Sequence, residues 1–422
     1  MASKPEIYEK PEPEEIFKFS FLLDSASIEY LVKHARIFVI IRGPPGTRKS
    51  LLAKYLMIKY PDGVICSADM YFDQPGIDKH RNPASLKKSH NFCMNWCEQE
   101  TKKGTSPIIV RNTNVRVYEM NFYLQLAAKA CYTVIIADLS GIFRFDPKEL
   151  EARNSKGLSA TYLTRRIRSW EELYPIYTGW FASPSDSSAI YCKATNIISE
   201  LNDVDSDFQC PSDQFQRESQ FFCMAAFCDS GKTLKAQTYY NQYKVQISCG
   251  RMFTLLLDGF LATKKLILGV VLLTSDQQDL TMSEEEETSS DNDITDKIMK
   301  LCIGDYLEKY QDYKLPSNAE ASSKKTLKCQ ERRKQFKTKI DDVSFIILAH
   351  RGSKVSFPYI RNIRKTSRSF FSNVINKENL ISDKHDKTTS SGSFCKLEDG
   401  VWFIQPKETL LLDTVFTGMY FW

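Results

Sequence analysis

A phosphate-binding loop lies near the start of the chain, directly after the apolar run 37–41. It consists of Gly43, Pro44, Pro45, Gly46, Thr47, Arg48, Lys49 and Ser50. In such loops backbone N–H groups surround the phosphates, a lysine reaches their outer oxygens and a hydroxyl ligates Mg²⁺. We therefore expect ATP or another nucleotide to bind here, with Mg²⁺ held by Ser50. The glycine that usually precedes the lysine is Arg48, which either crowds the phosphate or adds charge beside it.

Three further polar segments fall where a phosphoryl-transfer site needs them. Asp69 would act as the base of a kinase-type reaction or hold the water shell of Mg²⁺. Asn112 and Asn114 would position a substrate. Three arginines would close over the phosphates as a cationic lid: Arg165, Arg166 and Arg168. The alternative for each segment is structural, with Asp69 as a helix cap, the asparagines in turns and the arginines in solvent.

The elements around these residues alternate between strand and helix. Apolar runs predict strands at 37–42, 63–66, 107–111 and 132–137. Amphipathic segments predict helices at 50–59, 84–102, 117–130 and 159–171. This alternation is typical of an α/β domain with a parallel sheet covered on both faces. Ligands of such sheets bind at the carboxyl ends of the strands, which is where the loop falls.

The rest of the chain indicates a second domain of α+β type. We expect a lead-in at 1–35, a first domain at 36–182, a linker at 183–215 and a second domain at 216–422. An insertion at about 283–340 interrupts the second domain, and its acidic start at 283–296 predicts a disordered loop. The apolar stretch 253–274 is broken by charges, so it predicts two buried strands and no membrane span.

The composition is that of an ordinary globular protein. The chain has 422 residues, 42% of them hydrophobic and 26% charged. Twelve scattered cysteines with no Cys-x-x-Cys pair, and no secretory signal, favour reduced thiols in a cytoplasmic protein. Neither a myristoylation motif nor a prenylation box is present, so we expect no lipid anchor.

A basic belt occupies residues 324–368. It holds fourteen Lys or Arg against three acids. Its members include Lys324, Lys328, Arg332, Arg333, Arg361, Arg364 and Arg368. The belt would bind RNA phosphates or the anionic surface of a membrane, which would add a peripheral membrane location. The alternative is a solvated face that balances the nearby acidic run.

Several short motifs resemble those of the 2′,3′-cyclic nucleotide 3′-phosphodiesterase (CNPase) family. They lie at 42–46, 67–71, 113–114, 173–181, 227–232, 253–255 and 416–420. The resemblance implies a polynucleotide-kinase-like P-loop domain followed by a 2H phosphoesterase domain. It also implies contact with membrane or cytoskeleton as an option. The 2H domain is named for two His-x-Thr or His-x-Ser motifs, whose histidines act as acid and base on a 2′,3′-cyclic phosphate.

The chain departs from that resemblance at the catalytic positions. The first motif aligns with Phe222 and Met224, and the second with Phe345 and Ile347. All four polar groups are thus replaced by apolar ones, which suggests a packed pseudo-active site or a site for an apolar ligand. His350 follows the second motif and is expected to lie on the surface at a strand end. Arg111 stands where related proteins have an acid.

Three functions remain open from the sequence. The first is a family member without cyclic phosphodiesterase activity that binds nucleotide or RNA, or serves as a scaffold. The second is a kinase that transfers phosphate from ATP to a polynucleotide or nucleoside hydroxyl through Lys49, Ser50 and Asp69. The third is an active cyclic phosphodiesterase that uses other residues. Whether the chain is an enzyme at all is therefore undecided at this stage.

Overall fold

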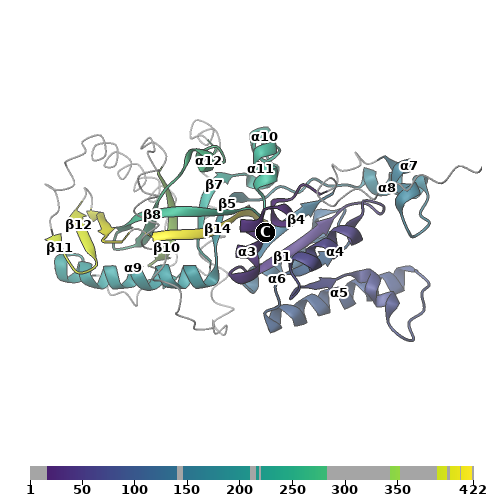
Figure 1. Ribbon diagram of the computed structural model, residues 1–422, viewed down its shortest axis with the longest axis horizontal. Coiled ribbons are helices and arrows are strands. Elements are labelled where there is room, and N and C mark those ends of the chain that lie inside the picture. The colour runs from purple at the N-terminus through teal and green to yellow at the C-terminus, as the bar shows by residue number, and fades with distance from the viewer. Residues whose placement is uncertain are drawn as a thin grey trace, which may run out of the picture. The chain divides into compact units, whose positions relative to one another are not determined.

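The computed structural model describes residues 17–139, 146–209, 215–217, 220–282, 343–351, 387–396, 400–408 and 410–420. Within these residues the chain forms two compact units, whose elements are labelled in Figure 1. The first unit ends at Leu173 and also holds Gln246–Arg251. The second takes Tyr174–Val245 and continues from Met252 to Tyr420.

The first unit is built on a parallel sheet with strand order β2-β3-β1-β4 among the described residues. The strands are β1 (Ile37–Arg42), β2 (Val64–Cys66), β3 (Ile108–Arg111) and β4 (Thr133–Asp138). Every residue of β1 is buried, as expected for a central strand covered on both faces. The predicted α/β unit is confirmed, and each predicted strand ends within one residue of the observed one.

Helices and short 3₁₀ turns connect these strands, precede β1 and follow β4. They are α2 (Ser20–Leu23), α3 (Ser25–Lys33), α4 (Lys49–Lys59), η1 (Ala68–Asp73), α5 (Pro83–Lys103), η2 (Val117–Glu119), α6 (Asn121–Lys129), α7 (Pro147–Arg153) and α8 (Ala160–Arg168). Local sequence explains the bounds of α5. Asn82 and Ser85 form a capping box, Pro83 starts the first turn and Gly104 ends the helix in a left-handed conformation.

The second unit is an antiparallel sheet. Its strands are β5 (Tyr177–Ala182), β6 (Gln216–Arg217), β7 (Phe222–Phe227), β8 (Met252–Ala262), β9 (Leu266–Leu272), β10 (Val343–His350), β11 (Lys387–Thr388), β12 (Gly392–Lys396), β13 (Trp402–Pro406) and β14 (Leu410–Met419). The path runs β11-β12-β13-β8-β14-β5-β7-β10-β6, and β9 pairs with both β8 and β10. The stretch 253–274 therefore forms the two buried strands that were predicted.

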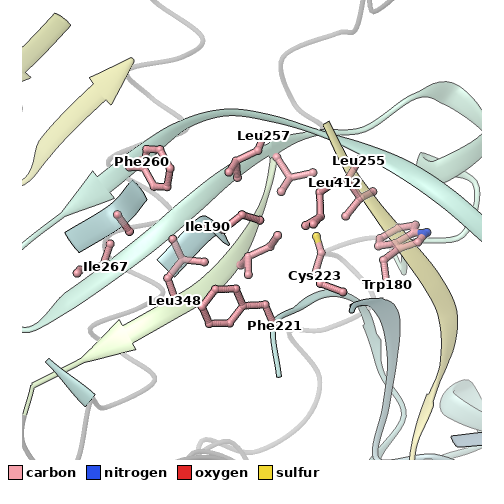
Figure 2. Packing of buried hydrophobic residues seen from close by; sticks show 14 of the residues in the cluster. Trp180, Ile190, Phe221, Cys223, Leu255, Leu257, Phe260, Ile267, Leu348 and Leu412 are labelled. Atoms are coloured by element: carbon pink, nitrogen blue, oxygen red, sulfur yellow. The ribbon is translucent and has the colours of Figure 1, made fainter. Parts of the chain in front are cut away.

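One face of this sheet packs on the helix α9 (Pro184–Val204), seen running along the sheet in Figure 1. Figure 2 shows part of the resulting core, in which Trp180, Cys223 and Leu348 come from three different strands. Ile190 reaches this core from α9. The remaining elements of the unit are η4 (Asp229–Gly231), α10 (Leu234–Tyr240) and α12 (Ser275–Gln278). The helix α11 (Tyr243–Ser248) begins in this unit, and its residues from Gln246 onward belong to the first.

The division between the units differs from the predicted one in two ways. The predicted first domain ended at 182, but β5 lies between β14 and β7 in the second sheet, so the boundary falls at Leu173. The predicted linker 183–215 contains α9, which Ser183 caps and which buries an apolar stripe against the sheet. The acidic run 283–296 lies outside the described residues, and so does the belt 324–368 apart from 343–351, which holds β10. No helix within the described part has the length and apolarity to cross a bilayer.

Candidate functional site

The phosphate loop joins β1 to α4 at the carboxyl end of the parallel sheet. The Thr47 hydroxyl donates to Pro44 O at 2.8 Å, and Gly43 N donates to Thr113 O at 3.0 Å. Gly46 has φ +93°, and a Cβ there would lie 2.5 Å from Leu150 O. Glycine is therefore required at position 46 by both its backbone angle and its surroundings.

Lys49 is the first residue of α4, and its side chain turns back into the loop. Its Nζ donates to Gly43 O at 2.7 Å and to Pro44 O at 2.8 Å. The pKa of Lys49 is lowered to about 7, chiefly by burial and also by the charges of Lys156 and Arg111, while the charge of Asp69 opposes the shift. An anion in the loop would favour the charged form of the amine. A bound phosphate would therefore raise the pKa of Lys49.

Arg48 keeps the backbone shape that a glycine would have at this position. It has φ +61° and ψ +26°, which is the left-handed region. That region costs a residue with a Cβ roughly 1–2 kcal/mol. The loop thus retains its turn despite the substitution, at the expense of local strain.

Ser50, the expected ligand of Mg²⁺, is engaged by an arginine. The Arg111 Nη1 donates to Ser50 Oγ at 2.6 Å, and its Nη2 donates to Ser67 Oγ at 3.1 Å. Oxygen ligands lie about 2.1 Å from Mg²⁺, so an ion on Ser50 would sit within roughly 5 Å of the guanidinium nitrogen. Two cations at that distance repel each other. The residues present therefore do not fit the metal that the loop motif implies.

Asp69 lies in η1 and is held by two cations. Its carboxylate contacts Arg81 Nη1 at 2.9 Å and Lys156 Nζ at 2.8 Å. Burial alone would raise the pKa of Asp69, but hydrogen bonds and charge from Lys156 and Arg81 outweigh it and lower the pKa to about 2. A carboxylate with so low a pKa is a weak general base near neutral pH. Neither partner was predicted from the sequence, because both lie in irregular segments that give no signal for the contact.

Asn112 and Asn114 are both buried and both bind the protein itself. Asn112 Oδ1 accepts from Ala68 N at 2.9 Å, and its amide donates to the Tyr123 hydroxyl at 3.2 Å. The Asn114 amide donates to Ile41 O at 3.3 Å. These contacts tie the segment after β3 to η1 and β1, so the two asparagines brace the loops of the first unit. Their contact with a substrate remains a prediction.

The predicted lid arginines lie on the last turn of α8. Arg165 and Arg168 are exposed, while Arg166 is half-buried and pairs with Glu119 at 3.6 Å. No described contact brings any of the three to the loop or to Ser50. Their role as a lid remains a prediction.

A buried arginine that was not assigned to the site from the sequence directly precedes the loop and binds the segments next to it. Arg42, fully buried at the end of β1, donates to Asn114 O, Val115 O and Glu171 O at 3.2, 3.2 and 2.7 Å. Its Nη1 also lies 3.4 Å from Asp138 Oδ2, and its Cζ lies 4.0 Å from the centroid of the Trp170 ring. Its place in the motif at 42–46 was the available signal.

The four residues that align with the His-x-Thr motifs of the resemblance lie together on two neighbouring strands of the second unit. Strands β7 and β10 pair antiparallel through Cys223 and Ile346, and both of these residues point into the core. Because side chains alternate along a strand, the flanking positions face the opposite side of the sheet. These are Phe222, Met224, Phe345 and Ile347.

Aromatic packing fills this face around Phe222. The Phe222 ring stacks on Tyr177 with centroids 4.7 Å apart and on Phe181 with centroids 5.5 Å apart. Phe345 is buried, whereas Met224 and Ile347 are half-buried. No group on these four side chains can bind or release a proton.

His350 differs from its predicted surface position. It is fully buried at the end of β10, where β9 and β6 flank the strand on its two sides. A strand end between two neighbours is interior, which is why the expectation of a surface residue was wrong.

Comparison with known proteins supports the resemblance seen in the motifs. No protein-family model matches the chain. Over 303 residues the chain is 26% identical to 2′,3′-cyclic-nucleotide 3′-phosphodiesterase of Mus musculus, which covers 67% of this chain and 69% of the relative. It is 34% identical over 140 residues to NEDD4-binding protein 2 of Homo sapiens, which covers 33% of this chain and 8% of that protein.

Solved structures give weaker likenesses. One described as the Pnkp1/Rnl/Hen1 RNA repair complex has a TM-score of 0.28 and 15% identity, over 32% of this chain and 44% of that one. A fungal RNA kinase has a TM-score of 0.25 and 10% identity, over 91% of this chain and 99% of that one. Scores this low do not bear on fold or function.

Proposed function

Because the chain is related in sequence to 2′,3′-cyclic-nucleotide 3′-phosphodiesterases over two thirds of its length, we propose that it is a nucleotide-binding relative of those enzymes without their hydrolytic activity. The observation that carries the loss of activity is the apolar face made by Phe222, Met224, Phe345 and Ile347 on β7 and β10. Opening a cyclic phosphate requires one group to take a proton from water and another to protonate the leaving oxygen. Imidazoles titrate near neutrality and can do both, but hydrocarbon side chains cannot.

Hydrolysis of 2′,3′-cyclic AMP by the purified protein tests this proposal. We expect no turnover above buffer, in wild type or in a Phe222→Ala variant. Turnover by wild type that persists in Phe222→Ala, after contaminating activity is excluded, would show that catalytic groups lie elsewhere. A variant with Phe222→His, Met224→Thr, Phe345→His and Ile347→Thr is expected to gain activity, provided that the exchanged side chains keep the β7–β10 pairing.

Nucleotide binding is supported by the loop geometry. The turn is formed, and Lys49 donates to two carbonyl oxygens of the loop. The helix α4 directs the positive end of its dipole towards the loop. Titration calorimetry with ATP and ADP tests this part. Lys49→Ala is expected to weaken binding about tenfold or more, since a charge-assisted hydrogen bond is lost. Lys59→Ala, at the exposed far end of α4, serves as the matched control and should bind like wild type.

A kinase reaction is less well supported, because Asp69 is held in two ion pairs. We expect no ATP-dependent labelling of a 5′-hydroxyl RNA above the Lys49→Ala background. Labelling that disappears in Lys49→Ala and in Asp69→Asn would establish the kinase instead.

RNA is a second ligand that the charge of the belt 324–368 favours. Apart from 343–351 the belt lies outside the described residues, so the proposal rests on its sequence alone. Phosphate contacts make affinity fall steeply with salt. We expect RNA binding whose affinity drops between 50 and 200 mM salt, and a salt-independent affinity would exclude the belt as the contact.

A further inference from the structure

Arg111 stands at a position where it meets the loop from the neighbouring strand. It is the last residue of β3, and β3 pairs in parallel with β1, with Arg111 opposite Ile41. Its guanidinium bridges the hydroxyls of Ser50 and Ser67, at 2.6 and 3.1 Å. The Ser67 hydroxyl in turn donates to Arg111 O at 2.9 Å. The arginine is therefore fixed by contacts at both its backbone and its side chain.

This arrangement conflicts with a magnesium ion in two ways. The Ser50 oxygen that would ligate the metal already accepts a short hydrogen bond from a cation. The nearby carboxylate, Asp69, is neutralised by Arg81 and Lys156.

A guanidinium can supply what the metal would otherwise supply to a bound polyphosphate. It carries a permanent positive charge, and its planar donors match pairs of phosphate oxygens. It cannot offer the two charges and the ligand-ordering geometry that Mg²⁺ gives to phosphoryl transfer. Such a site is suited to holding a nucleotide and poorly suited to cleaving it.

We propose that Arg111 takes the place of Mg²⁺ in this site, so that the loop binds the polyphosphate of a nucleoside di- or triphosphate without a metal ion. This inference rests on the proposed nucleotide binding. It adds a property that the loop motif by itself does not predict, since the motif implies a metal-dependent site.

The test is calorimetry of ADP and ATP binding, in EDTA and in Mg²⁺, with wild type and variants of Arg111. For wild type we expect dissociation constants that agree within about threefold in the two conditions. Arg111→Gln removes the charge and is expected to weaken binding in EDTA about tenfold or more. Arg111→Asp should bind weakly in EDTA and recover affinity when Mg²⁺ is added, because the carboxylate can now assist Ser50 in holding the ion.

Arg36→Gln is the matched control. Arg36 precedes β1 at the amino-terminal edge of the same sheet and stacks on Tyr132, so the variant loses the same charge away from the loop. It should behave like wild type in both conditions. Circular dichroism and thermal melts of each variant separate loss of binding from loss of folding, and Arg111→Lys, which retains a charge, provides a second check should Arg111→Asp unfold.

The outcomes distinguish the two proposals. Wild-type binding that is equal with and without Mg²⁺ supports both. Wild-type binding that tightens more than about tenfold with Mg²⁺ overturns the role of Arg111 and leaves nucleotide binding in place. No binding in either condition overturns both.

Discussion

Arg42 is the residue whose loss should affect the first unit most. It is fully buried, donates hydrogen bonds to three backbone carbonyls and pairs with Asp138. Arg42→Met fills a similar volume but leaves those acceptors unpaired, so we expect unfolding free energy to fall by about 3 kcal/mol. Denaturant melts measure it. Arg165→Met, an exposed arginine, should change stability by less than about 0.5 kcal/mol, and equal effects of the two variants would refute the bracing role of Arg42.

Asp69 should make stability depend on pH in the acid range. Its folded pKa of about 2 lies below the ordinary value of 3.8. A carboxyl group whose pKa is lowered by folding stabilises the protein above its ordinary pKa, and this contribution is lost as pH falls towards the folded pKa. We therefore expect Asp69→Asn to flatten the fall in melting temperature between pH 5 and pH 3. Asp62→Asn, in an exposed turn, is the control, and an unchanged pH profile for Asp69→Asn would argue against the ion pairs.

At the scale of elements, two adjacent phenylalanines at the start of β7 have opposite surroundings. Phe221, just before the strand, is fully buried in the core of Figure 2, whereas Phe222 is half-buried in the aromatic stack on the other face. Phe221→Ala should cost about 3–5 kcal/mol. Phe222→Ala should cost about 1–2 kcal/mol, the worth of partial burial and ring stacking. Equal costs in denaturant melts would mean that the face carrying Phe222 is as much a part of the core as the face carrying Phe221.

The elements of the first unit were predictable from sequence because each is specified locally. Unbroken apolar runs mark β1, β3 and β4, and the loop motif fixes where α4 begins. The second unit was less predictable, because α9 starts with Pro184 and a polar turn that suggested a linker. Its burial pattern, through Ile190, Ala194, Ile197 and Leu201, carries a helical spacing that could have revealed it.

Contacts between segments distant in sequence could not be predicted in this way. Nothing around Arg111 indicates that its guanidinium lies on Ser50, since the contact depends on the register of β3 beside β1. The ion pair of Asp69 with Lys156 likewise joins two segments distant in sequence. The motifs indicated the candidate site, but its charge balance, on which the proposed metal-free binding rests, emerged only from the packing.

At the scale of the whole molecule, the placement of β5 decides where the chain can be divided. Trp180 on β5 is fully buried and packs edge-to-face with Phe253 and Phe416, from two other strands of the second unit. A fragment that starts at residue 183 lacks this strand and would leave β14 and β7 without their shared neighbour. A fragment that starts at 174 retains it.

We therefore expect the fragment 174–422 to give a cooperative melt and a β-rich circular dichroism spectrum, and the fragment 183–422 to aggregate or remain unfolded. Removing a central strand leaves the edges of two strands unpaired and exposes the core beneath them. The loss of folding free energy exceeds the small net stability of a domain of this size. Adding Trp180→Ala to the longer fragment provides a graded comparison, because it deletes one large buried side chain and leaves the strand in place. Equal folding of the two fragments would show that the second unit folds without β5. The boundary between the two domains would then fall at 182, as predicted from the sequence.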